Sequence, residues 1–235
     1  MAATRAVTGC CRLTLTFEEF AAAWSRLHGD FDPLAASPPV RGWVRLAWRG
    51  GALLARRGVG PGAVTTGGLV LCAAVPAVVP LGPGGLLLGG VFVLLAAYAD
   101  GLDGAVAVIS QRASRIGFVY DSVADRLGEL AWLVAFRLAG APGWLVVAAG
   151  AASWLHEYVR ARSAASGMRE IGAVTVGERP TRVSVTASAL IVAGVAGLVR
   201  PGWAPVVVTI GAAAWLALAM AGLGQLVVAV RRALR

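Results

Sequence analysis

The sequence predicts an all-α integral membrane protein, a bundle of six transmembrane helices with an N-terminal amphipathic helix at the membrane interface. Hydrophobic residues make up 58% of the 235-residue chain and charged residues only 14%, a composition typical of membrane proteins. Six long apolar segments follow one another after residue 60. The basic residues, all of them arginine, gather in alternate connections between these segments.

Residues 1–60 are mixed and polar, and we treat them as a segment distinct from the membrane domain at 61–235. Acidic residues directly after Thr16 predict the start of a short helix, because carboxylates are favoured near the positive end of the helix dipole. This helix is expected to end near His28. The proline-containing stretch 30–39 then predicts a linker.

A second helix is expected over residues 40–57, where arginines alternate with tryptophan and leucine. Arg41, Arg45 and Arg49 fall on one stripe of such a helix. This pattern suits a helix that lies in the membrane interface with its basic face toward lipid headgroups. The alternative is a surface helix packed on the rest of the protein.

The six apolar segments are each long enough to cross about 30 Å of hydrocarbon at about 1.5 Å per residue. Their expected limits are 63–81, 85–109, 116–138, 142–162, 182–199 and 203–230. On one side of the membrane the connecting loops hold only Arg137 and Arg200, while the other side carries nearly all the remaining arginines. The positive-inside rule therefore predicts a multi-pass protein of the bacterial cell membrane with both termini in the cytoplasm.

The net charge of +9 does not indicate nucleic-acid binding, because the arginines flank apolar segments. Anionic membrane lipids and phosphorylated substrates are the expected partners. Cys10, Cys11 and Cys72 show neither metal-binding spacing nor a disulfide framework. The N-terminus lacks the features of a signal peptide.

Four aspartates interrupt the second and third apolar segments. Each costs about 2.5–3.5 kcal/mol to place in a bilayer, which indicates a function. Asp100 and Asp103 are three residues apart and Asp121 and Asp125 are four apart, so each pair shares one helical face. Because Asp103 and Asp121 are equally distant from the turn near Arg112, an antiparallel hairpin brings them to one depth near the cytoplasmic boundary. Such oxygen ligands suit Mg²⁺ or Mn²⁺.

The spacing of these residues resembles a family signature. The chain reads D-G-L-D-G-A-V-A-V, then eight residues, then G-F-V-Y-D-S-V-A-D. This resembles the signature D-x-x-D-G-x-x-A-R-x8-G-x3-D-x3-D of the CDP-alcohol phosphatidyltransferases, which are six-helical membrane enzymes. The matching residues are Asp100, Asp103, Gly104, Ala107, Gly117, Asp121 and Asp125. Pro61 and Thr65 resemble the family's proline and threonine at the start of the first span.

The resemblance implies a metal-dependent transfer of a phosphatidyl group from a CDP-diacylglycerol-type lipid to a small polar alcohol, with release of CMP. Two divalent ions, Mg²⁺ or Mn²⁺, would be held by Asp100, Asp103, Asp121 and Asp125. Asp125 would also be the general base. The residues expected at the CDP-lipid are Pro61, Thr65, Gly104, Ala107, Arg112, Arg115 and Gly117. The family also implies a homodimer.

One signature position departs from the family. Val108 stands where the family has an arginine that helps to bind the cytidine nucleotide. Arg112 or Arg115 could substitute, the donor could be bound differently, or activity could be weak or absent. The alternative function is therefore a catalytically weakened family member that binds lipid or nucleotide without turnover.

The acceptor site is expected in residues 156–183, which look like the corresponding region of bacterial phosphatidylinositol-phosphate synthases. Arg160 and Arg182 would bind a phosphorylated alcohol, because guanidinium groups match phosphate oxygens; plain positive-inside anchoring also explains them. Inositol phosphate is the first expected acceptor and glycerol 3-phosphate the second. Glu129 is expected to pair with an intramembrane arginine. A transporter is disfavoured, because the acids gather at one face of the membrane.

Overall fold

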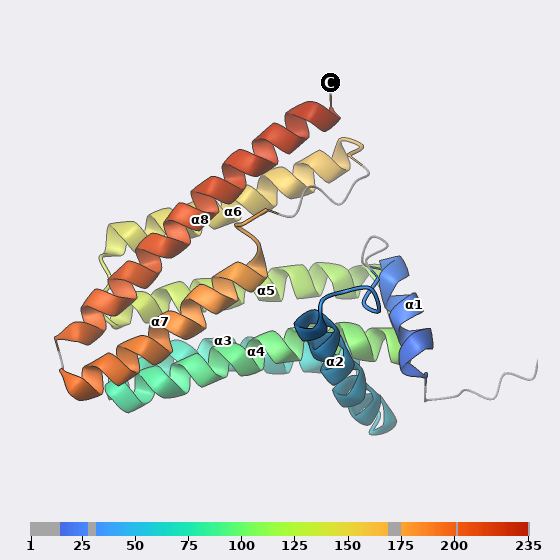
Figure 1. Ribbon diagram of the computed structural model, residues 1–235, viewed down its shortest axis with the longest axis horizontal. Helices are drawn as coiled ribbons and strands as arrows, with labels where there is room; N and C mark the ends of the chain where they lie inside the picture. The colour runs from blue at the N-terminus through green and yellow to red at the C-terminus, as the bar shows by residue number, and fades with distance from the viewer. Residues whose placement is uncertain (1–14, 28–31, 169–174, 201, 235) are drawn as a thin grey trace, which may run out of the picture. The chain divides into compact units, whose positions relative to one another are not determined.

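Figure 1 shows the computed structural model, which describes residues 15–27, 32–168, 175–200 and 202–234. In these ranges the chain is helical and contains no strand, which confirms the predicted all-α class. The helices are α1 (Phe17–Leu27), α2 (Pro38–Arg56), α3 (Pro61–Val78), the short 3₁₀ helix η1 (Val79–Leu81), α4 (Pro83–Ile109), α5 (Arg115–Leu138), α6 (Gly143–Ala165), α7 (Arg179–Val199) and α8 (Trp203–Ala233). Cys10 and Cys11 lie outside the described residues.

Four helical segments are long and apolar enough to cross a membrane. They are Pro61–Leu81, Pro83–Ile109, Arg179–Val199 and Trp203–Ala233. The other two predicted spans correspond to α5 and α6, which carry more charged residues along their length. The apolar helices support a membrane protein, and the count of six spans stays a prediction.

The chain divides into two compact units. The first comprises residues 1–61 with 101–114, and the second comprises residues 62–100 with 115–235. The boundary therefore falls within the continuous helix α4, just after Asp100. The end of α4 clusters with the N-terminal segment.

The first unit begins with a capping box at the start of α1, as the acidic residues after Thr16 predicted. The Glu19 backbone N–H donates to Thr16 Oγ1 at 3.2 Å, and the Thr16 N–H donates to Glu19 Oε2 at 2.8 Å, so two orphan donors are satisfied reciprocally. Phe20 of α1 is fully buried in an apolar core that α2 and the end of α4 complete. Trp48 Nε1 ties α2 to the Leu15 carbonyl at 3.1 Å.

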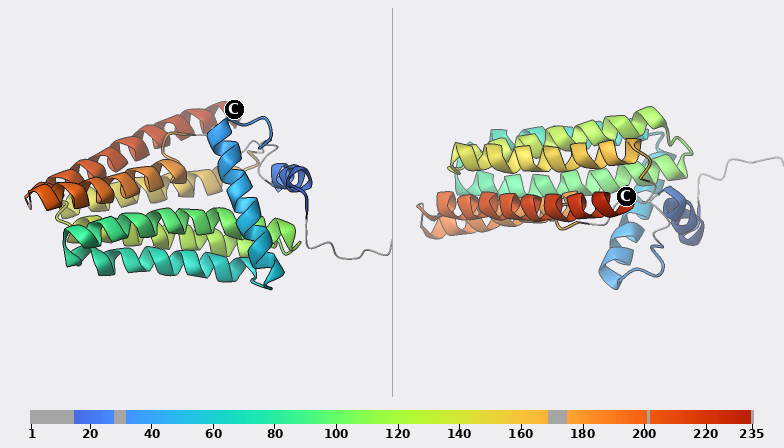
Figure 2. Two further views of the ribbon diagram at one scale, coloured as in Figure 1. Left: turned by 60° about the horizontal axis from the view of Figure 1, so that its bottom comes forward. Right: turned by 90° about the horizontal axis from the view of Figure 1, so that it is seen from above.

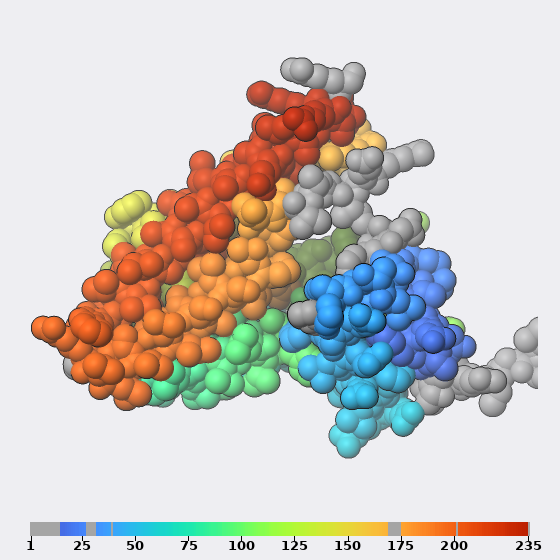
Figure 3. All heavy atoms as spheres, in the orientation of Figure 1, coloured from blue at the N-terminus to red at the C-terminus, as the bar shows by residue number. Residues whose placement is uncertain are grey.

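The second unit holds the long helices, which lie lengthwise beside one another in both views of Figure 2. Its core is built around large side chains: the rings of Phe136 and Trp215 meet edge to face at 6.3 Å, and Trp215 Nε1 donates to Ser153 Oγ at 2.8 Å. α8 contacts both α6 and α7, and the α7 and α8 surfaces adjoin in Figure 3. At Gly211 of α8, a Cβ would lie 2.5 Å from the Cβ of Ala189, so only glycine permits this approach of α8 to α7.

The two halves of α5 differ in character. Its first half carries Asp121 and Asp125, whereas its second half buries Trp132 and Phe136 completely. At Gly128, a Cβ would lie 2.9 Å from the Cys72 sulfur of α3. The close packing of the second half fixes the helix that carries the aspartates.

Candidate metal centre and its charged surroundings

Three of the four predicted metal ligands come together. Asp100 and Asp103 lie one turn apart on α4, and Asp121 lies on α5; their carboxylate oxygens are all within 4.8 Å of one another. We call these three residues the acidic cluster. Such a group of oxygens suits a hard divalent cation, which prefers several carboxylate ligands. The donor set therefore fits Mg²⁺ or Mn²⁺.

Asp125, the fourth predicted ligand, lies one turn beyond Asp121 and is held by arginine. It forms an ion pair with Arg179, the first residue of α7. Arg179 Nη1 also donates to Asp100 Oδ1 at 2.7 Å. Arg126 Nη2 lies 3.9 Å from Asp125 Oδ2. One guanidinium thus bridges an aspartate of α4 and an aspartate of α5.

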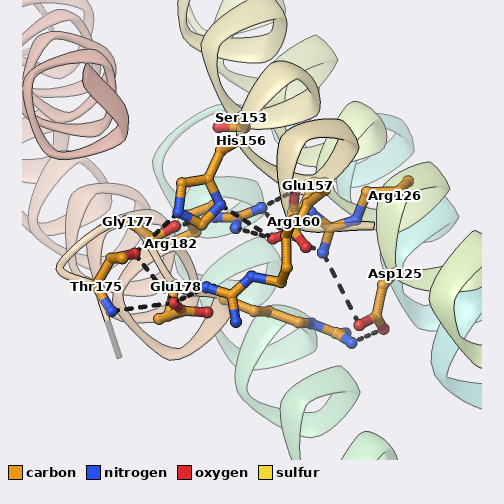
Figure 4. Close-up of polar contacts among 12 residues, drawn as sticks. Asp125, Arg126, Ser153, His156, Glu157, Arg160, Thr175, Gly177, Glu178 and Arg182 are labelled. Carbon is orange, nitrogen blue, oxygen red and sulfur yellow. Dashed lines mark hydrogen bonds and ion pairs between the residues drawn. The ribbon is translucent and has the colours of Figure 1, made fainter. Parts of the chain in front are cut away.

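A second group of charges lies beside Asp125 and touches it through Arg126 (Figure 4). Arg182 is only 2% exposed. Its Nη1 donates to both carboxylate oxygens of Glu129, at 2.8 and 2.7 Å, and its Nη2 donates to Glu157 at 2.6 Å. Its Nε donates to the Gly177 carbonyl at 2.8 Å. All three guanidinium nitrogens of Arg182 are therefore engaged, and Glu129 pairs with an arginine, as expected from the sequence.

Arg126 completes this group. Its Nη2 lies 3.0 Å from Glu129 and its Nη1 lies 3.3 Å from Glu157. The four residues Arg126, Glu129, Glu157 and Arg182 carry two positive and two negative formal charges. We call them the sealed network. It links α5, α6 and α7 next to the acidic cluster.

Arg160, the other predicted acceptor residue, is tied to the segment that precedes α7. It forms an ion pair with Glu178, whose carboxylate also accepts from the Thr175 N–H at 3.1 Å and from its hydroxyl at 3.0 Å. The Thr175 hydroxyl lies 2.9 Å from Nε2 of buried His156. The Arg160 side chain is 27% exposed, so unlike Arg182 it is accessible from outside the bundle.

Two of the predicted donor-site residues lie at the start of α3. Pro61 is its first residue and Thr65 is buried in its second turn. The neighbouring Thr66 hydroxyl lies 2.8 Å from the Tyr120 hydroxyl. This contact joins α3 to α5 directly beside Asp121.

The predicted donor-site arginines are exposed. Arg112 lies in the turn between α4 and α5, and Arg115 is the first residue of α5. Gly117 is exposed in the same first turn. These positions leave both guanidinium groups accessible from solvent.

The remaining signature residues lie in the first unit. At Gly104, a Cβ would lie 3.4 Å from the ring of Trp24, and Ala107 is half-buried. Val108 is buried in the apolar core with Phe20 and Val44. The position at which the signature has an arginine is thus filled by hydrophobic packing.

Sequence reasoning did not select Arg179, although it lies at the centre of the charged contacts. A signal for it exists. Arg179 begins α7, where the helix dipole disfavours a cation by about 0.3–1 kcal/mol, so nearby acids would stabilise it. Those acids are distant in sequence and could be identified only in the folded chain.

Comparisons with known proteins identify the family of this chain. The family model described as CDP-alcohol phosphatidyltransferase matches residues 59–228. The phosphatidylinositol phosphate synthase of Mycobacteroides abscessus is 36% identical over 162 residues, which cover 63% of this chain and 69% of that protein. The synthase of the same name from Mycolicibacterium smegmatis is 39% identical over 153 residues, covering 61% of this chain and 65% of that protein. The chain thus spans about two thirds of the length of these relatives.

The solved structures that it resembles include those of the phosphatidylinositol phosphate synthase of Mycobacterium tuberculosis. The complex with manganese and citrate has a TM-score of 0.61 at 26% identity and covers 77% of this chain and 87% of that chain. The complex with bound CDP-DAG has a TM-score of 0.62 at 24% identity, covers 79% of this chain and 94% of that chain, and shows the shared fold. Together with the match over residues 59–228, these findings establish that the chain belongs to the divalent-metal-dependent CDP-alcohol phosphatidyltransferase family.

Proposed function

We propose that the protein transfers a phosphatidyl group from a CDP-diacylglycerol-type lipid to a small phosphorylated alcohol. The observation that supports this most directly is the acidic cluster, whose carboxylate oxygens lie within 4.8 Å of one another at the signature positions of the family. Inositol phosphate is the proposed acceptor, because the relatives from M. abscessus and M. smegmatis are phosphatidylinositol phosphate synthases. Glycerol 3-phosphate is the second choice.

The proposed metal site uses Asp100, Asp103, Asp121 and Asp125 to hold two ions of Mg²⁺ or Mn²⁺. When bound, such a pair would neutralise the charge that develops on the departing CMP phosphate. The aspartates keep the site negative enough to attract the ions.

Asp125 is the proposed general base. It would accept the proton of the acceptor hydroxyl while that oxygen forms a bond to the phosphatidyl phosphorus and the bond to CMP breaks. Its position one turn beyond Asp121 puts it beside the acidic cluster. Its side chain is 18% exposed, so a substrate can approach it.

The two substrates are proposed to use different arginines. Arg160 is the better candidate for the acceptor phosphate because it is accessible. Arg182 would support the site by holding Glu129 and Glu157. For the donor, Arg112 or Arg115 would serve in place of the arginine that Val108 replaces, alongside the proposed contacts of Pro61, Thr65, Gly104, Ala107 and Gly117.

A release assay for CMP tests this function. Purified protein in nanodiscs, supplied with Mn²⁺ or Mg²⁺ and CDP-diacylglycerol, should release CMP with inositol phosphate and more slowly or not at all with glycerol 3-phosphate. CMP release that favours glycerol 3-phosphate would reassign the acceptor. Binding of the CDP-lipid without CMP release for any acceptor would instead support a binding protein, the second candidate, which the buried Val108 motivates.

We also propose that all six helices α3–α8 cross the cell membrane, forming one domain over residues 61–235, with the site and both termini in the cytoplasm. α5 and α6 have 24 and 23 residues, enough to span about 30 Å of hydrocarbon. Labelling of single cysteines by an impermeant reagent tests this: a cysteine at the exposed Arg200 should react from outside the cell and one at Arg112 only after permeabilisation. The same side for both would exclude the topology.

The N-terminal amphipathic helix is proposed to be α2, lying in the membrane interface. Next to the buried Val44 and Ala47, this helix exposes Trp43 and Leu46, which are 46% and 48% exposed. Exposed apolar side chains beside arginines favour an interfacial position. A spin label at Leu46 should therefore report the depth of lipid headgroups, and a fully aqueous signal would contradict this position.

We further propose a homodimer formed through α5 and α6. A cavity of about 760 Å³ between these helices is lined almost entirely by apolar side chains, among them Leu130, Val134, Leu138, Val147 and Trp154. A second copy could bury these side chains. Cysteine cross-linking at Val147 should yield dimers in membranes, whereas cross-linking at exposed Val206 of α8 should not.

A further inference from the structure

We infer that Arg179 is an internal counter-ion of the acidic site and that its guanidinium competes with a divalent cation for the carboxylates. The inference rests on the proposed metal site. This role was not assigned to Arg179 from the sequence. Metal affinity then depends on Arg179, although this residue is not a metal ligand.

The geometry of Arg179 carries the first step. Its Nη1 donates to Asp100 Oδ1 at 2.7 Å and the same group forms an ion pair with Asp125. These carboxylates come from the two helices that would supply the metal ligands. A cation bound to these carboxylates would draw on the same negative charge that Arg179 now neutralises. Arg179 and the cation therefore compete for the same carboxylates.

The second step is that the Arg179 contact is incomplete. Its Nε is buried and has no hydrogen-bond acceptor, and the residue begins α7, where the helix dipole disfavours a cation. Arg182, three residues later, differs in both respects: all its nitrogens are bonded and it lies within the helix. Of these two arginines, Arg179 is therefore the one that a doubly charged ion can displace.

Thermodynamic linkage turns this competition into a measurable quantity. If metal binding weakens the hold of Arg179 on the carboxylates, removal of Arg179 must strengthen metal binding by the same factor. If Arg179 only orients the carboxylates for the metal, its removal should instead weaken metal binding. The direction of the change in metal affinity thus separates the two roles.

The first test measures the Mn²⁺ affinity of the full-length protein in nanodiscs without substrates, using electron paramagnetic resonance of free Mn²⁺. Arg179→Gln should bind Mn²⁺ about tenfold more tightly than wild type, a coupling of ordinary size. Arg179→Lys, which keeps the charge, should lie between them. Arg162→Gln removes an exposed arginine at the end of α6 and should change the affinity less than about twofold. Unchanged or weaker binding in Arg179→Gln would overturn the inference.

The second test needs no variant. Phenylglyoxal modifies accessible guanidinium groups, and mass spectrometry locates the modified residues. Wild-type protein should be modified faster at Arg179 with saturating Mn²⁺ than without it, while buried Arg182 stays unmodified in both states. Equal or slower modification of Arg179 with Mn²⁺ would overturn the inference. A wild type that binds no Mn²⁺ would remove the metal site and the inference together, whereas Mn²⁺ binding that is insensitive to Arg179 removes the inference alone.

Discussion

The acidic cluster and the sealed network are adjacent on α5, yet they handle charge in opposite ways. In the sealed network, two arginines form ion pairs with two glutamates, and Glu129 and Arg182 are almost completely buried. In the acidic cluster, three carboxylates lie within 4.8 Å of one another, and Asp100 retains 36% exposure of its side chain. One region balances its four formal charges, whereas the other gathers three carboxylates and exposes Asp100 to a ligand.

This difference separates structural from functional charges within one helix bundle. Loss of one member of a buried, fully bonded ion pair strongly destabilises the fold. Carboxylates that lie close together repel one another, so a group of them indicates a site that binds a ligand. Variants in the two regions should therefore affect different quantities.

The largest effect is expected from Asp125→Asn, which tests the functional side of the comparison. Loss of the general base should lower the rate of CMP release by about 10²-fold to 10⁴-fold, while thermal unfolding of the protein changes little because the side chain is partly exposed. Asp32→Asn is the matched control, since it removes an exposed carboxylate and keeps an oxygen that can accept from the Leu34 N–H. Near-wild-type release in Asp125→Asn would exclude Asp125 as the base.

The next effect is expected from Glu129→Gln, which tests the structural side. Removing one charge of a buried pair should lower the free energy of unfolding by about 3–5 kcal/mol, measured by denaturant titration in mixed micelles. CMP release per folded molecule should change far less than in Asp125→Asn. Glu18→Gln, at an exposed site on α1, should leave stability unchanged. A stable Glu129→Gln protein that has lost all turnover would reverse the assignment of the two regions.

Val108→Arg should have a smaller effect, and on stability rather than on catalysis. Val108 is 8% exposed and packs in the apolar core of the first unit, so a longer charged side chain should cost about 1–3 kcal/mol of unfolding free energy through overpacking. Val108→Met is the uncharged control. If Val108→Arg instead folds normally and lowers the KM for the CDP-lipid, the position belongs to the donor site and not to this core.

The smallest effect is expected at the contact between α3 and α5. Thr66→Val removes the 2.8 Å hydrogen bond to the Tyr120 hydroxyl and the 2.7 Å bond that Thr66 Oγ1 donates to the Gly62 carbonyl, each of which should cost about 1 kcal/mol. Tyr120→Phe removes only the first of these bonds, and the double variant should cost little more than Thr66→Val alone. Additive losses in this double-mutant cycle would show that the two hydroxyls do not interact.

Much of the fold and part of the site could be predicted from local patterns. The apolar segments predicted the helices, and the spacing of Asp100, Asp103 and Asp121 predicted that they share faces of a helical hairpin. The tight spacing of the signature also identified the family. The sequence could not show that Arg182, expected at the acceptor, is closed within the sealed network, or that Arg179 bridges Asp100 and Asp125.

The sequence by itself determined the helices, the acidic residue pairs and the family, because helical periodicity places residues three or four apart on one face without reference to the rest of the chain. Only the tertiary structure decided which arginine meets which acid and what surrounds Val108. Arg182 and Glu129 are 53 residues apart, and Arg179 and Asp100 are 79 apart. Charges attract without regard to sequence distance, so their partners are fixed by how the helices pack.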